Sequence, residues 1–267
     1  MLSYHPLESL RIELASPTST YADPTLYPRL SVVETAGMLH VDFYGAPFDT
    51  PFERLCTILS DAAVAGSLAT LTLRSPDEGG NGTCNWDLTP LVDKASAFPK
   101  LEHFSIQQNQ PGDHNRIIVA RSYDEEGVLG RLLSKAPVLD AVIVPSAPDE
   151  SFFRVQNHPL RFLSVDAGYD TQSFIANLAK SASFPKLESL EFGEYAETYV
   201  DGFPEGCTPI EDYRQLFRSR VFARLRAFTW RNPVCSADEI AELRAIVPDL
   251  QFRVVRFSAE YLRRDTK

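Results

Sequence analysis

The chain has 267 residues, of which 44% are hydrophobic and 23% charged, a composition typical of a globular protein with a sizeable core. A formal net charge of −10 disfavours non-specific nucleic-acid binding, because such binding needs a basic surface. No apolar run is long enough to cross a membrane, and no basic segment precedes an apolar one at the N-terminus. We therefore expect neither a membrane span nor a signal peptide.

The cysteines are scattered and form no C-x-x-C pair. This usage favours free thiols in a reducing compartment, so a cytoplasmic location is predicted. The four positions are Cys56, Cys84, Cys207 and Cys235.

The first 50 residues differ from the rest of the chain. Residues 15–28 are rich in Pro, Ser and Thr, which predicts a loop, and 29–45 read as two strands around Glu34–Gly37, a β-hairpin. Before them, the phrase PLESLRI places Leu7, Leu10 and Ile12 at a spacing that recurs downstream. We expect 1–50 to form a capping segment.

From residue 68 onward, one apolar spacing recurs. The phrase FPKL occurs at 98 and again at 184, and each copy opens an L-x-x-L-x-L pattern that predicts a short strand with alternate side chains buried. The pattern begins at Leu68, Leu101, Leu139, Leu160, Leu187 and Leu225, and a further strand is predicted at 251–257.

Helical periodicity fills the intervals between these strands. Apolar residues recur on one helical face in 52–66, 171–182, 209–222 and 237–247. Strand–helix units repeated every 20 to 40 residues or so cannot bury their own apolar faces alone, whereas stacked neighbours can.

The phrases resemble leucine-rich repeats over roughly residues 50–258. LEHFSIQQN (101–109) even matches the asparagine of L-x-x-L-x-L-x-x-N, at Asn109. The resemblance implies an α/β fold in which 51–267 form an irregular solenoid of parallel strands and helices, with 1–50 as its cap. The asparagine is replaced elsewhere, by Pro76, Ala147, Gly168, Tyr195 and Pro233.

An ordinary α/β domain with helices on both sheet faces is the alternative. It would favour continuously apolar strands. The strand at 101–106 instead carries His103 and Ser105 at alternate positions, and Ser189 and Glu191 do the same at 187–192. We therefore expect one solvated face, as on the concave side of a solenoid.

No sequence motif indicates a reaction, and no cofactor or metal site is predicted. H-E-x-x-H, G-x-S-x-G and phosphate-binding glycine motifs are absent, and the histidines lack ligand spacing. The glycine-rich segment 77–85 is interpreted as a loop insertion. Carboxylates around Asp166 and Glu191 could serve acid–base catalysis, but a solvated acidic surface is favoured.

Charge is distributed unevenly along the C-terminal half. Residues 166–212 contain ten acids against Lys180 and Lys186, whereas 213–231 contain six arginines and no acid. Asp166, Glu191 and Glu194 fall on or just after neighbouring strands. An acidic stripe on the concave side is therefore predicted, which would orient a basic partner.

The predicted site combines this stripe with aromatic side chains of the long connection after residue 192, because exposed tyrosines often anchor interfaces. We predict a non-enzymatic protein-binding role without nucleic-acid or membrane partners. The predicted partner-binding residues are His103, Gln107, Phe162, Asp166, Tyr169, Asp170, Glu191, Glu194, Tyr195, Tyr199 and Arg231.

A second resemblance concerns the role. The stretch from 158–170 through 194–203 and 212–217 to 228–233 resembles uncharacterised bacterial repeat proteins of the immunity-protein type. That resemblance implies an antitoxin that occludes a basic toxin or effector domain. Two alternatives stay open: a substrate adaptor of the ubiquitin-ligase type, and an enzyme with a hidden carboxylate site.

Overall fold

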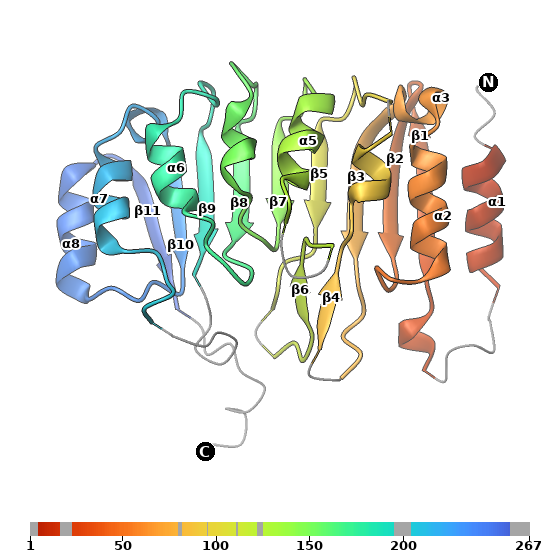
Figure 1. The fold of residues 1–267 in the computed structure, drawn as a ribbon, viewed down its shortest axis with the longest axis horizontal. Coiled ribbons are helices and arrows are strands. Elements are labelled where there is room, and N and C mark those ends of the chain that lie inside the picture. The colour runs from red at the N-terminus through yellow and green to blue at the C-terminus, as the bar shows by residue number, and fades with distance from the viewer. Residues whose placement is uncertain are drawn as a thin grey trace.

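The computed structural model describes residues 5–16, 23–79, 82–94, 96–110, 112–121, 125–194 and 204–256. Within these ranges a nine-stranded sheet has its strands side by side in chain order, β1-β2-β3-β5-β7-β8-β9-β10-β11 (Figure 1). β1 and β2 are antiparallel, and each neighbouring pair from β2 to β11 is parallel. The strands are β1 Arg29–Thr35, β2 Met38–Tyr44, β3 Leu68–Arg74, β5 His103–Ile106, β7 Ala141–Val144, β8 Phe162–Asp166, β9 Ser189–Gly193, β10 Ala227–Arg231 and β11 Gln251–Val255.

Helices cover one face of this sheet. Figure 1 shows the longer ones, among them α2, α5, α6 and α7, on the side of the sheet toward the viewer. The fold is therefore mixed α/β with a mostly parallel central sheet. The helices are α1 His5–Leu14, α2 Thr50–Leu59, α3 Ala62–Ala65, α4 Thr89–Val92, α5 Val128–Lys135, α6 Phe174–Lys180, α7 Ile210–Phe217 and α8 Ala237–Ile246, with 3-10 turns η1 Pro24–Leu26, η2 Glu150–Arg154 and η3 Phe222–Arg224.

The apolar repeat becomes the core through the register of the strands. The second apolar position of each phrase pairs with its equivalent in the next strand, so that these side chains form one row facing the helices. All of these side chains except that of Phe252 are buried. The row runs Leu71, Phe104, Val142, Leu163, Leu190, Phe228 and the half-buried Phe252.

The alternate side chains point away from the helices. In β5, Phe104 and Ile106 are buried while His103 is exposed, and β10 buries Phe228 and Trp230 while Arg231 stays half-buried. We call the side of the sheet that carries these alternate residues the open face.

Both FPKL copies form the same turn. The Leu101 N–H donates to the Phe98 carbonyl at 3.2 Å, and Leu187 repeats this bond to Phe184 at 3.2 Å. All four side chains are buried, and each turn leads directly into the next strand. Equivalent bonds of 3.1 Å occur at Leu139, Leu225 and Leu250, so this turn recurs beyond the two identical copies.

The β-hairpin predicted within 29–45 is confirmed as β1 and β2. Ala36 and Gly37 form its turn with φ of 54° and 73°, the left-handed conformation that two-residue hairpin turns require. β2 then pairs in parallel with β3, which joins the N-terminal segment to the main sheet.

Two local predictions are wrong. PLESLRI belongs to helix α1, not to a strand, because its L-x-x-L spacing also suits a helix: Leu7 and Leu10 are buried on one side, and Glu8 pairs with Arg11 one turn away. The loop predicted over 77–85 contains the short strand β4 (Thr83–Asn85), which pairs in parallel with β6 (Arg116–Ile118) in a separate sheet.

The hydrophobic core is continuous from Leu7 in α1 to Leu243 in α8. It includes residues of the N-terminal segment as well as of every unit that follows. In the described part of the chain, no helix is both long and apolar enough for a membrane crossing.

Candidate binding site on the open face

The register of β8, β9 and β10 brings three of the predicted site residues together. Asp166 on β8 lies opposite Gly193 on β9, which in turn lies opposite Arg231 on β10. Glu191 lies two residues before Gly193, on the same face, and pairs with Ser164 of β8. Residues far apart in the chain thus form one polar cluster near the carboxyl ends of these strands.

An ion pair forms the centre of the cluster. Arg231 Nη2 lies 2.9 Å from Asp166 Oδ1, and each side chain is only 14% exposed. The pair reaches across β9 because Gly193 has no side chain, since a Cβ there would overlap Asp166 Oδ1. Burial raises the pKa of Asp166 to about 6, although the neighbouring Arg231 and Arg116 guanidinium groups oppose that rise.

Hydrogen bonds extend the cluster along the face. Arg231 Nη2 donates to the Ser164 hydroxyl at 3.4 Å, and that oxygen lies 3.2 Å from both Glu191 Oε2 and Gln108 Oε1. The hydroxyl carries a single proton, so it donates to one of these two acceptors at a time. The Ser164 hydroxyl therefore links Arg231 either to Glu191 or to Gln108.

Arg116 adds a second guanidinium beside these acids. It comes from β6, donates to the Gly168 carbonyl and lies 5.6 Å from the centre of the Tyr169 ring. Arg231 and Arg116 thus both lie near Asp166, where each favours its charged form. The predicted acidic stripe is therefore interrupted at Asp166, whose carboxylate is paired with an arginine from β10.

The remaining predicted residues are more dispersed. His103 is exposed on β5, Phe162 is half-buried on β8, and Gln107 follows β5 with half its surface covered or more. Asp170 is exposed after β8 and accepts a hydrogen bond from the Gln172 amide at 2.7 Å. Tyr195 and Tyr199 lie outside the described residues.

Glu194 is not on the open face, which corrects the prediction for this residue. It is the first residue after β9, and its buried carboxylate accepts hydrogen bonds from the Tyr213 hydroxyl and from the Thr208 amide at 3.2 Å. Burial raises its pKa. Tyr213 is itself buried, with its ring centre 4.0 Å from that of Trp230. These groups tie the chain after β9 to α7 and cannot contact a partner.

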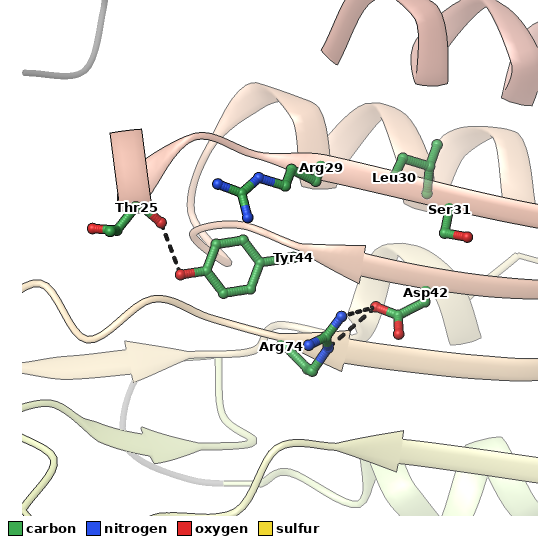
Figure 2. Close-up of a pocket in the computed structure, with 7 residues that line it drawn as sticks. All are labelled: Thr25, Arg29, Leu30, Ser31, Asp42, Tyr44 and Arg74. Atoms are coloured by element: carbon green, nitrogen blue, oxygen red, sulfur yellow. Dashed lines mark hydrogen bonds and ion pairs between the residues drawn. The ribbon is translucent and has the colours of Figure 1, made fainter. Parts of the chain in front are cut away.

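A pocket of about 450 Å³ lies at the other end of the open face, where β1, β2 and β3 meet. Figure 2 shows Tyr44 between Arg29 and Arg74, whose guanidinium carbons lie 5.5 and 5.9 Å from the ring centre. The lining residues are Thr25, Arg29, Leu30, Ser31, Asp42, Tyr44 and Arg74.

This pocket does not follow from the sequence pattern alone. Its hairpin residues could have been grouped from the turn, which sets Arg29 opposite Tyr44 and Ser31 opposite Asp42. Arg74 could not have been grouped with them from the sequence, because its place beside Tyr44 depends on how β2 pairs with β3.

Comparison with protein-family models and with curated proteins finds no match to this chain. Within the described ranges, no three His, Cys, Asp or Glu side chains come together as a metal-binding group.

Proposed function

We propose that this chain is a leucine-rich-repeat-like protein that binds another protein through the open face and performs no catalysis. One observation carries the proposal: a sheet built strand by strand in chain order has helices on one face and ordered polar side chains on the other. Stacked repeats commonly present such an extended surface to a partner.

The chemistry of the open face supports a partner with charged groups. The Ser164 hydroxyl, which accepts a hydrogen bond from Arg231, can donate one to Glu191, and the Gln172 amide orients the exposed Asp170. Because these side chains are already ordered, binding costs little further side-chain entropy. Glu191 and Asp170 are the acids that we propose to contact cationic residues of the partner.

Within protein binding, we propose the role of an immunity protein that occludes a toxin domain. The sequence resemblance and the acidic composition support this role. The test is an affinity pull-down from the native host, followed by co-expression with the products of neighbouring genes. A partner that is toxic alone and harmless with this protein is the expected result, whereas recovery of ligase components would favour an adaptor.

The placement of the site is tested with charge reversals. Glu191→Lys should weaken binding of that partner by about tenfold or more, because it brings a like charge against the partner's cations. The matched control is Glu53→Lys, on α2 at the covered side of the sheet, which should leave affinity unchanged. Equal affinities for the two variants would exclude this placement.

A further inference from the structure

The pocket between β1, β2 and β3 holds two guanidinium groups in different states. Arg74 is paired with a carboxylate, since its Nη2 and Nε lie 2.8 and 3.2 Å from Asp42 Oδ1. Arg29 donates to the Pro24 carbonyl at 3.1 Å, and none of the described carboxylates forms an ion pair with it.

Tyr44 fixes the position of both arginines. Its hydroxyl donates to the Thr25 carbonyl at 2.8 Å, and burial raises its pKa, so the phenol keeps the proton that it donates. The ring then offers a surface to each guanidinium (Figure 2). Arg29 is thus held by the stack and by one backbone bond while its other N–H groups remain available.

A guanidinium fork with free N–H donors binds a carboxylate through two parallel hydrogen bonds. Ser31 lies two residues further along β1 on the same side, lines the same pocket and can donate a further hydrogen bond. On Arg74, the Nε and Nη2 donors are already bonded to Asp42. Arg29 is therefore the guanidinium of this pocket that can receive a carboxylate from a bound molecule.

We propose that this pocket binds a peptide carboxylate, with Arg29 as its principal ligand and Ser31 as a second donor. This proposal rests on the proposed function, because the carboxylate is taken to belong to the partner protein. Its test uses small peptides alone, so its failure is distinguishable from failure of the proposed function.

The test is an NMR titration of the full chain with three capped probes. Acetyl-Gly-Glu-Gly-amide offers a side-chain carboxylate, acetyl-Gly-Gly-Gly with a free carboxyl group offers a C-terminal one, and acetyl-Gly-Gln-Gly-amide offers neither. Saturating shifts at Arg29, Ser31 and Tyr44 are expected with at least one carboxylate probe and not with the glutamine probe. The responding probe identifies the source of the carboxylate.

Two variants assign the effect to the guanidinium. Arg29→Gln should weaken binding of the responding probe by about tenfold or more. Arg244→Gln is the matched control, because Arg244 also lies over an aromatic ring, 5.3 Å from the centre of Phe252, but lies outside the pocket. The Arg244→Gln variant should bind the responding probe with unchanged affinity.

Three results would overturn the proposal. These are equal binding of the glutamine probe, equal weakening by both variants, and binding of inorganic phosphate with no response to either carboxylate probe. The last result would identify an anion site of a different kind.

Discussion

At the scale of single residues, the open face depends on an absent side chain. Gly193 separates Asp166 from Arg231, and the ion pair occupies the space that a Cβ would take. Separating two buried, paired charges destabilises a protein by more than the pair contributes to its stability. Each charge is then left without its partner in a position where water solvates it poorly.

Gly193→Ala should therefore destabilise the protein by about 2 to 4 kcal/mol. Urea unfolding followed by circular dichroism measures the change in free energy. The control is Gly82→Ala, where the nearest atom to an added Cβ is Asn115 Nδ2 at 3.5 Å, an ordinary contact. Similar midpoints for Gly193→Ala and the unchanged protein would refute the steric argument.

The sequence predicts part of this site. The period of two along a strand correctly places Asp166 and Glu191 on the same face, and Arg231 with them. It does not predict that Asp166 and Arg231 neutralise each other, because that contact depends on the register across β9. The prediction for Glu194 is wrong because Glu194 follows Glu191 by three residues, so the same period of two places it on the opposite, covered side, where it is buried.

At the scale of elements, an acidic residue lies just before helix α5, because Glu125 is two residues before the N-cap Gly127. The buried carboxylate of Glu125 accepts hydrogen bonds from the amides of Leu129 and Gly127, the latter at 2.9 Å. Burial raises the pKa of Glu125 to about 7, against the effect of these bonds. The helix therefore begins at a group that titrates near neutral pH.

This pKa predicts a pH dependence of stability. The folded protein holds the Glu125 proton more tightly than the unfolded chain does, so this residue's contribution is fully present below pH 4.5 or so and is lost as pH rises to about 7. In Glu125→Gln, the free energy of unfolding should therefore fall less steeply with pH across that window. The total loss between its two ends should be smaller by roughly 3 kcal/mol than in the unchanged protein.

The matched control for this prediction is the neighbouring, exposed Glu126. Chemical denaturation at several pH values compares Glu125→Gln, Glu126→Gln and the unchanged protein. Comparing slopes removes any constant loss of stability that the amide causes. A slope equal to that of the unchanged protein in Glu125→Gln would contradict the assignment.

Most strands follow from the sequence, because each needs only a local apolar pattern and the turn before it. The spacing of Leu7 and Leu10 fits a helix and a repeat phrase equally well, so the sequence pattern does not distinguish α1 from a strand. β4 and β6 were missed for another reason: each has three residues, and their pairing joins Cys84 to Ile117 without any local signal.

At the scale of the whole molecule, a continuous core predicts that the described units unfold together. Repeat proteins can lose this cooperativity, because each unit contacts mainly its neighbours. Two tryptophans report on opposite ends of the sheet. Trp86 packs edge-on against Phe52 at 4.8 Å in the N-terminal part, and Trp230 packs against Tyr213 near the other end.

The variants Trp86→Phe and Trp230→Phe each leave one reporter. In each variant, the urea midpoint from tryptophan fluorescence should coincide with the midpoint from far-ultraviolet circular dichroism. Comparing probes within one variant cancels the stability change that the substitution itself causes. Midpoints that separate in either variant would show that the two ends unfold independently.

The recurrent turn before the strands has a consequence for how proteins of this architecture vary in size. Because each inner strand of the described nine-stranded sheet pairs with the strands before and after it in that sheet, a unit bounded by two such turns can be duplicated or lost without altering its neighbours' alignment. Each event changes the width of the sheet by about 4.8 Å. Gene recombination at these boundaries can thus adjust how large a surface the protein spans, independently of the side chains that set its specificity.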